Sequence, residues 1–394
     1  MDSNWSCKLC GSGDLSLLLD LGAYELSTVY QPATSPQQRE IPIKLSKCEE
    51  CGLFQIPGDF QNSWVREVPS QGEFHEPEDH LDQVSSEVAR FFPPHSSVRG
   101  FSKKDQSMLA RLARFEFLVE IDTVLNSYET SCHSLSSATQ QYLARHKESY
   151  RTAERESCRI LVCRHALEHI DDLKKFLKKI ASVEYDYIYL ELPDAQNVLS
   201  GGKLWYLWED HRSYFLDENL VAIASCANSE VIWKQKIERS SESLLCCLIK
   251  NSDMPAVPPL TRRSRSTGKI QNLVPILETW ISANIQRRAV YFFGAGHLCS
   301  RMLHLVFSLK PALANDIFVV DGSTQKIGKR LPNTDLLIEP VGSILPNSVV
   351  VFVVNPEAYE AMHELKTRLN AQGSEVFQID DLCAELHGKS YDRV

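Results

Sequence analysis

The chain contains two blocks in which short apolar runs alternate with segments of helical spacing. In the first block the pattern predicts strands at 97–101, 117–122, 158–163, 185–192 and 244–249, and helices at 106–115 and 171–180. In the second block it predicts helices at 270–286 and 298–309, and strands at 289–293, 316–321 and 349–354. Alternating strands and helices are typical of parallel sheets covered by helices, so we expect an α/β fold with two sheets.

A proline-rich stretch separates the two blocks. It holds three prolines and a run of arginines between 262 and 265, a composition typical of a linker. A chain of 394 residues has room for two or three domains. We therefore expect a cysteine-bearing module at 1–72, a first α/β domain at 73–250, a linker at 251–269 and a second α/β domain at 270–394.

Four of the twelve cysteines form two C-x-x-C pairs, each followed by a glycine. Such a turn points two thiolates at one ion, and two turns complete the four-cysteine site of structural zinc. Unrelated buried cysteines and a redox C-x-x-C are the alternatives. A site closed by four thiolates has no open position for a substrate, so we predict a structural Zn²⁺ held by Cys7, Cys10, Cys48 and Cys51. We expect the other eight cysteines in hydrophobic cores.

The charge balance narrows the possible partners. Lys and Arg number 42 against 51 Asp and Glu, a formal charge of −9, whereas nucleic acids and anionic membranes bind positive surfaces. No apolar run approaches the roughly 20 residues of a membrane span. The N-terminus lacks the basic and apolar regions of a signal peptide. We expect a cytoplasmic protein that binds neither nucleic acid nor membrane.

The second block contains a partial nucleotide-binding pattern. A strand ends in Gly294-Ala295-Gly296-His297, a helix follows, and the next strand ends in Asp321. Strand, Gly-x-Gly turn, helix, strand and acid is the layout in which helix amides face a phosphate or another anion. Only two of the three glycines of the full fingerprint are present. A tight turn that binds nothing is the alternative interpretation.

The order of motifs resembles the three-part family of S-adenosylmethionine (SAM)-dependent sugar C-methyltransferases, which act on nucleotide-linked keto-deoxysugars. The resemblance rests on the stretches 19–27, 48–55, 163–170, 191–194, 208–215, 293–297 and 326–332. The segment Glu76-Pro77-Glu78-Asp79-His80-Leu81-Asp82 is similar to a branch of that family with Glu-Pro-Glu-x-His-Leu-Asp. The resemblance implies a zinc module, a Rossmann-like class I methyltransferase sheet and a C-terminal Rossmann-like domain. It also implies a small-molecule substrate.

The cofactor contacts implied by this resemblance follow the ends of the strands, where ligands bind in α/β sheets. The turn after the first strand has one glycine, Gly100, where methyltransferases of this class usually have several. Lys104 and Asp105 would contact the carboxylate and amine of the cofactor, and Asp122 would bind its ribose. The full set expected at the cofactor is Gly100, Ser102, Lys104, Asp105, Asp122 and His165. Glu168 and His169 are expected only to cap and orient the following helix.

C-methylation beside a ketone needs a base for the C–H proton and donors that hold the enolate. In the loop that matches the family's catalytic segment, His211 is the candidate base, with Asp210 or Glu209 to orient it. Trp208 stands where the family has a tyrosine, so a hydroxyl role would pass to Tyr214. A structural hydrogen-bonding role for His211 is the alternative.

A dense group of ionisable residues precedes the first α/β strand. His75 and Glu76 could supply acid–base groups or part of a second metal site, and a solvated acidic loop is the alternative. Contacts to the substrate are expected from Glu78, His80, Gly294, Gly296, His297 and Asp321.

The sequence therefore favours a SAM-dependent C-methyltransferase that acts on a nucleotide-sugar or related small keto substrate. Two other interpretations stay open. One keeps the fold without methyl transfer, with a different cofactor or a role as a biosynthetic partner. The other is an NAD(P)-dependent oxidoreductase that uses the C-terminal domain.

Overall fold

The computed structural model describes residues 5–27, 29–35, 40–56, 78–93, 96–115, 118–120, 158–181, 185–238, 243–251, 272–354 and 362–391. Strands within these residues form four sheets. His75, Glu76, Asp122 and the expected linker at 251–269 lie outside the described residues, except for position 251.

An antiparallel sheet holds the N-terminal segment. Its order is β1 (Leu15–Tyr24), β3 (Ile41–Cys48), β4 (Phe54–Gln55) and β9 (Ser213–Tyr214). The last strand comes from far along the chain and pairs with β4 through Phe54 and Tyr214. A two-stranded ladder pairs β2 (Gln31–Pro32) with β14 (Lys329–Arg330). The N-terminal segment is thus hydrogen-bonded to both larger parts of the molecule.

The central sheet has six strands in the order β10-β11-β8-β7-β5-β6. Their bounds are β5 (Ser97–Gly100), β6 (Leu118–Glu120), β7 (Arg159–Arg164), β8 (Tyr187–Asp194), β10 (Ser229–Ile237) and β11 (Ser243–Asn251). Strand β11 runs antiparallel to both of its neighbours, and the remaining pairs are parallel. One reversed strand next to the edge of a parallel sheet is the arrangement of the class I methyltransferase sheet.

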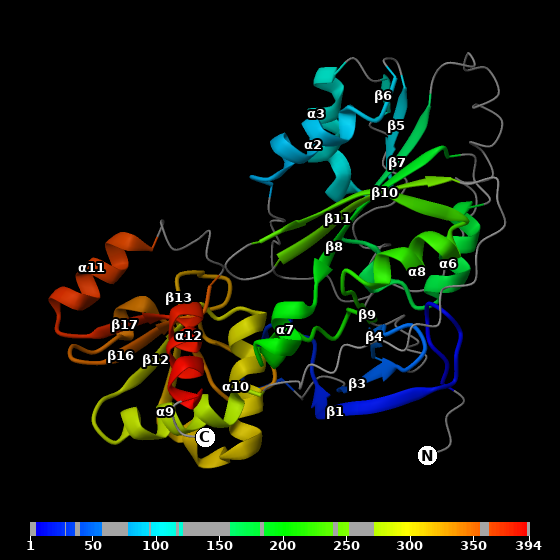
Figure 1. Cartoon of the computed structure of the whole chain (residues 1–394). Coiled ribbons are helices and arrows are strands. Elements are labelled where there is room, and N and C mark those ends of the chain that lie inside the picture. The colour runs from blue at the N-terminus through cyan, green and yellow to red at the C-terminus, as the bar shows by residue number, and fades with distance from the viewer. Residues whose placement is uncertain are drawn as a thin grey trace.

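Helices cover both faces of this sheet (Figure 1), so the domain has three layers. Helices α2 (Leu81–Ala89) and α3 (Gln106–Leu112) pack on one face, and α6 (Leu173–Ala181) and α8 (Asn219–Cys226) on the other. Along β7, Ile160 and Val162 join the first core, while Leu161 and Cys163 join the second, as the two-residue period of a strand requires.

The C-terminal sheet is fully parallel, in the order β15-β13-β12-β16-β17. Its strands are β12 (Val290–Phe293), β13 (Ile317–Asp321), β15 (Ile338–Pro340), β16 (Val349–Phe352) and β17 (Glu375–Gln378). Helices α9 (Val274–Ile285), α10 (His297–Leu309) and α12 (Ile379–Tyr391) contribute to the core on one face, and α11 (His363–Ala371) to the core on the other.

The largest hydrophobic core joins the parts of the chain. It includes Tyr24 and Ile43 of the N-terminal sheet, Trp205 of the segment after α7 (Gln196–Ser200), and Met302 of α10. The three larger sheets are separate as hydrogen-bonded units. The hydrophobic core is nevertheless continuous between the N-terminal and C-terminal parts. The segment 204–207, between β8 and β9, is buried at this junction.

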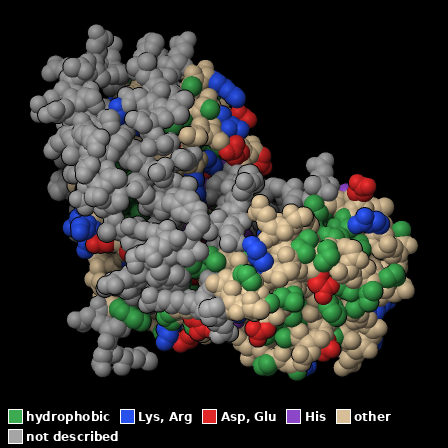
Figure 2. Space-filling view, turned by 180° about the vertical axis from the view of Figure 1, so that it is seen from behind, with side chains coloured by type: hydrophobic (Ala, Val, Ile, Leu, Met, Phe, Trp, Pro, Cys, Tyr) green, Lys and Arg blue, Asp and Glu red, His purple; other side chains and the backbone are tan. Residues whose placement is uncertain are grey.

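The fold class predicted from the sequence is confirmed. Each predicted strand and helix within the described residues is present, with ends shifted by a few residues. Cys246 and Cys247 lie buried in β11, as expected for core cysteines. In the described part of the chain, no helix is both long and apolar enough to cross a bilayer. Figure 2 shows hydrophobic side chains spread among few charged ones on one face of the C-terminal lobe.

Candidate functional site

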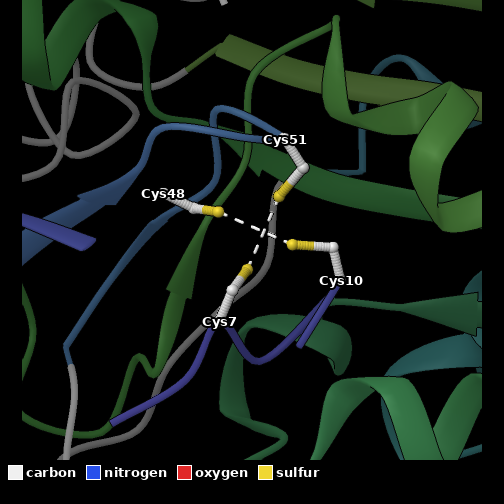
Figure 3. A group of neighbouring side chains, drawn as sticks. All are labelled: Cys7, Cys10, Cys48 and Cys51. Carbon is white, nitrogen blue, oxygen red and sulfur yellow. Dashed lines mark hydrogen bonds between the residues drawn. The ribbon is translucent and has the colours of Figure 1, made fainter. Parts of the chain in front are cut away.

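Four thiols converge between the N-terminal segment and the central domain. The Sγ atoms of Cys7 and Cys51 are 3.5 Å apart, as are those of Cys10 and Cys48 (Figure 3). Each C-x-x-C turn is closed by a glycine amide that donates to the first cysteine's carbonyl, and both glycines adopt a positive φ. Four converging thiols are the closed ligand set of structural zinc.

The cysteine cluster is attached to helices on the central sheet. The amide of Lys174 in α6 donates to the Lys8 carbonyl at 2.8 Å, and the Lys174 Nζ donates to the Cys10 carbonyl at 2.8 Å. Asn219 in α8 donates to the Cys51 carbonyl at 3.0 Å. Because β4 follows Cys51 and pairs with β9, the cluster also fixes the position of the loop that ends at β9.

That loop carries His211 to the carboxyl edge of the central sheet, beside Glu168 and His169. These two residues belong to the 3-10 helix η4 (Leu167–His169), which follows β7. One ligand-type atom from each of the three lies within 4.8 Å of the others. The imidazoles of His169 and His211 meet edge to face with ring centres 4.8 Å apart.

Backbone bonds explain why the two segments meet. The Arg212 amide donates to the Glu168 carbonyl at 2.6 Å, and the Ile56 amide donates to the Arg212 carbonyl at 3.1 Å. The buried Arg212 guanidinium donates to Asp171 at 2.8 Å. The loop is therefore held between the N-terminal module and η4, with His211 next to the end of β7.

A pocket of about 280 Å³, including its mouth, opens in front of this group of residues. It is lined by Glu168, Pro193, Asp194, Ala195, Val198, Tyr206, His211, Ser213 and Tyr214. The buried Oε2 of Glu168 and Oγ of Ser213 have no hydrogen-bond partner among the described residues. A pocket with such atoms on its wall can bind a ligand that supplies the missing hydrogen bonds.

Asp210 is the acidic neighbour of the two histidines. Its Oδ2 lies 3.7 Å from Nδ1 of His169, and its backbone oxygen lies 3.2 Å from the same nitrogen. Burial alone would raise the pKa of Asp210, but His169, His211 and Lys104 together hold that pKa below its usual value. The Asp210 carboxylate is thus kept charged beside the imidazoles. Lys104, a residue of the expected cofactor set, thus contributes its charge to this site.

Tyr214 and Glu209 are held by contacts other than those expected. The Tyr214 hydroxyl donates to the Trp208 carbonyl at 3.1 Å, and burial raises the pKa of Tyr214 well above its usual value. Tyr214 therefore fixes the loop. The expectation that Glu209 orients His211 is wrong, because its Oε1 accepts from the amide and hydroxyl of Ser27, and its Oε2 pairs with the buried Arg301.

The C-terminal domain reaches the same site through His297. Its ring lies against that of Trp208, with centres 3.7 Å apart and an interplanar angle of 38°. Burial lowers the pKa of His297 to about 3, so the imidazole is neutral. The structure thus brings together the predicted acid–histidine loop and the predicted Gly-Ala-Gly-His turn.

Gly294 and Asp321, two other expected residues of this motif, are in contact with neighbouring residues of the same domain. Gly294 has φ +97°, and a Cβ there would lie 2.6 Å from Val354 and 2.7 Å from the Val353 carbonyl. A Cβ on Gly296 would meet nothing within 4 Å. Asp321 accepts from the amides of Ala295 and Ser323 at 2.8 Å. Its expected role toward a substrate is therefore not supported, and the carboxylate is not free for the ribose contact of a dinucleotide site.

The space beside the turn after β5 is likewise occupied, by side chains of the same domain. A Cβ on Gly100 would lie 2.9 Å from Leu109 and 3.0 Å from Cβ of Asp105. The fully buried Asp105 accepts from the amides of Ser102 and Arg164, the latter at 2.8 Å. Cofactor contacts by Gly100, Ser102 and Asp105 are not supported, because all three are buried in the packing of this turn.

A second carboxylate, Glu191 in β8, forms a closed network next to the pocket. Its oxygens accept from Arg164 at 2.9 Å and from the Tyr189 hydroxyl at 2.9 Å, and each lies 3.1 Å from a ring nitrogen of His80 or His165. Burial would raise the pKa of Glu191, but these histidines and the Arg164 charge hold that pKa well below its usual value. The Nε2 atoms of His165 and His80 are therefore used by Glu191 and not by a cofactor or a substrate.

The expected contact of Glu78 with the substrate is not supported either. It is exposed near α2, where it accepts from Ser107 and lies 3.8 Å from Arg111, both residues of α3. The residues that sequence reasoning undervalued are Glu168 and His169. Their signal was their place directly after a buried parallel strand, at the edge where ligands bind.

Comparison with known proteins agrees with the first part of this description. Residues 7–62 match the family model Methyltransf_13, whose description is "Putative zinc binding domain". No curated protein sequence matches the chain.

Among solved structures, the chain is similar to magnesium protoporphyrin IX methyltransferase from Synechocystis PCC 6803 with bound S-adenosylhomocysteine. The identity is 11%, the match covers 49% of this chain and 95% of that chain, and the TM-score is 0.30. It is also similar to 1,6-didemethyltoxoflavin-N1-methyltransferase from Burkholderia thailandensis, with 12% identity, coverage of 45% and 80%, and a TM-score of 0.28.

Proposed function

We propose that the chain is a SAM-dependent methyltransferase for a small molecule, with the acceptor bound in front of His211. The observation that carries the proposal is the central sheet. Its strand order, with one reversed strand, is that of class I methyltransferases, and the His211 pocket lies at its carboxyl edge.

An acidic side chain beside the pocket fits a positively charged methyl donor. SAM carries a sulfonium, an ammonium and ribose hydroxyls, which are cationic or donate hydrogen bonds. The Asp210 carboxylate keeps one oxygen without a hydrogen-bond partner among the described residues, and its pKa is held below its usual value. This oxygen offers the complementary negative charge. When bound, SAM supplies an electrophilic methyl group to a nucleophilic atom of the acceptor.

The residues of the chain would prepare the acceptor for that transfer. His211 assists the loss of the acceptor proton, and the Asp210 carboxylate next to it stabilises positive charge on the imidazole. Tyr214 holds the loop in place through its hydrogen bond to Trp208. The buried junction around the pocket excludes water from the reacting atoms.

The acceptor that best suits the junction is a nucleotide-linked keto-sugar, methylated on carbon beside its ketone. The sugar would lie at the pocket lined by Glu168, His211 and Tyr214. The nucleotide would extend toward His297 at the amino end of α10, whose amides favour phosphate.

The four-cysteine cluster would hold structural zinc. Its thiols converge on one point, and the module that contains them positions β9 and His211. Zinc would thus act on the reaction by fixing the catalytic loop.

A second candidate function, the same fold without methyl transfer, is favoured by one observation. The turn after β5 is filled by Leu109 and Asp105, where a glycine-rich turn would admit a cofactor.

Calorimetric titration separates these candidates. The purified chain is titrated with SAM, S-adenosylhomocysteine, NADH and a nucleotide-linked sugar, and His211→Ala is compared with the wild type. We expect binding of both adenosyl ligands, and a His211→Ala variant that still binds them but loses about 100-fold or more in methyl transfer. Binding of NADH alone, or no binding of either adenosyl ligand, would rule the proposal out.

A further inference from the structure

Three side chains beside the pocket have the chemistry and spacing of metal ligands. Glu168, His169 and His211 present one carboxylate and two imidazoles, whose ligand atoms all lie within 4.8 Å of one another. Two imidazoles with one carboxylate, and positions left open for water or substrate, form a set that binds Zn²⁺, Mn²⁺ or Fe²⁺ in other proteins. The three come from two segments that the Arg212–Glu168 backbone bond holds together.

The orientation of His169 supports this function. Its Nδ1 lies 3.2 Å from the backbone oxygen of Asp210, to which it can donate a hydrogen bond. The Nε2 atom then carries the lone pair, and it faces Oε1 of Glu168 at a distance of 4.0 Å. Histidines that bind metal usually fix their second nitrogen in this way, through a carbonyl or carboxylate behind the ring.

Glu168 provides an independent observation. Its side chain is 2% exposed, and its Oε2 has no hydrogen-bond partner among the described residues. Its other oxygen lies 3.8 Å from His165, beyond hydrogen-bond distance. A buried carboxylate without full pairing is costly, and a cation at this position would compensate it.

We propose that Glu168, His169 and His211 bind one divalent transition-metal ion that faces the pocket. The open positions of the ion would take an oxygen of the acceptor, a ketone or hydroxyl, and polarise it as a Lewis acid. This inference rests on the proposed function for the identity of the acceptor. It also redefines the role of His211, which is then a metal ligand and not a free imidazole base; a water at another open position, made more acidic by the ion, would take the proton that the acceptor loses.

Titration with Mn²⁺ tests the site without SAM or an acceptor. Mn²⁺ prefers oxygen and nitrogen ligands to thiolates, so it discriminates this site from the four-cysteine cluster. The purified chain, with its zinc content measured first, is titrated while paramagnetic resonance reports free Mn²⁺. Glu168→Gln and His211→Ala remove ligands from two different segments, and Glu78→Gln removes an exposed carboxylate as the matched control.

We expect one Mn²⁺ per wild-type chain and per Glu78→Gln chain. Both ligand variants should bind Mn²⁺ about 100-fold more weakly or worse while keeping the wild-type zinc content and circular dichroism. If one ligand variant does not fold, the other decides. The proposal is overturned if Mn²⁺ does not bind the wild type at this stoichiometry, or if the folded ligand variants bind as the wild type does.

The two proposals can fail separately in this design. Mn²⁺ binding without SAM binding would leave the metal site standing and remove the methyltransferase assignment. If SAM binding and methyl transfer proceeded unchanged in metal-free protein, the methyltransferase assignment would stand and the metal site would be removed.

Discussion

Glu191 and Glu168 are two buried carboxylates at the same edge of the central sheet, and they differ in how they are satisfied. Glu191 lies within hydrogen-bond distance of Arg164, Tyr189, His80 and His165. Glu168 lies among histidines as well, yet its Oε2 has no hydrogen-bond partner among the described residues and lines a pocket. The oxygens of Glu191 are satisfied by neighbouring side chains, whereas one oxygen of Glu168 is left for a group outside the chain.

The difference shows that burial and charged neighbours alone do not identify a functional group. Both carboxylate oxygens of Glu191 are satisfied within the protein, so this residue contributes to structure. The group around Glu168 keeps bonding capacity toward a cavity, which is what binding or catalysis requires. A buried carboxylate is a better functional candidate when an oxygen is left for something outside the chain.

The largest effect on stability is expected for Glu191→Gln. This change leaves Arg164 buried without its charge partner, which should lower the free energy of unfolding by about 3–5 kcal/mol. Urea unfolding measures the change. The exposed Glu78→Gln is the control and should stay within about 0.5 kcal/mol of the wild type. If Glu191→Gln and Glu78→Gln both lowered the free energy of unfolding by the same small amount, the structural role assigned to Glu191 would be contradicted.

Asp105 should make the free energy of unfolding depend on pH. Burial raises the pKa of Asp105 to about 7 in the folded chain. Because the folded pKa lies above the unfolded value of about 4, this stability is complete below about pH 4 and is lost as the pH rises from about 4 to about 7. Relative to Asp105→Asn, the wild type should lose about 4 kcal/mol between pH 4 and pH 8.

Unfolding of both Asp105 proteins by urea across that pH range provides the measurement. A stability difference between wild type and Asp105→Asn that stays constant with pH would contradict the raised pKa.

Glu168→Gln should produce the opposite pattern to Glu191→Gln. We expect methyl transfer to fall about 100-fold, equivalent to about 2.7 kcal/mol, because the group acts on the bound acceptor. Stability should change by less than about 1 kcal/mol, since Oε2 makes no hydrogen bond within the described residues. Single-turnover assays and urea unfolding on the same preparation give both values. A loss of stability as large as that of Glu191→Gln would place Glu168 in the closed network.

The same contrast recurs at the two glycines of the C-terminal turn. Gly294→Ala must adopt φ near +97° and overlap the Val353 carbonyl, so it should cost about 1–3 kcal/mol. Gly296→Ala has free space and a negative φ, so it should change stability by less than about 1 kcal/mol. Thermal unfolding of the two variants compares them directly. Equal losses would show that Gly296 is also needed for packing.

Much of the fold could be predicted from the sequence because apolar periodicity reports burial. The strand at 158–163 and the helix at 171–180 follow from two-residue and 3.6-residue spacing, and the structure has both. The convergence of the four cysteines was also predictable, because each turn carries its own glycine.

The site was predicted only in part, because its contacts depend on topology. The pairing of β4 with β9 and the Arg212–Glu168 bond place His211 beside Glu168, and no local pattern encodes that contact. Glu209 and Asp210 are neighbours in sequence, yet Glu209 is paired with Arg301 of α10 while Asp210 lies beside His169. The internal role of Asp105 was hidden because its partner Arg164 ends a different strand, β7.

A crystal structure of the chain with S-adenosylhomocysteine tests the central claim most directly. We predict that the ligand lies at the carboxyl edge of β5 and β7, with its sulfur directed toward the pocket formed by Glu168 and His211. A ligand bound instead at the Gly294 turn of the C-terminal domain, or an edge that stays closed by Asp105 and Glu191 at saturating ligand, would contradict the account.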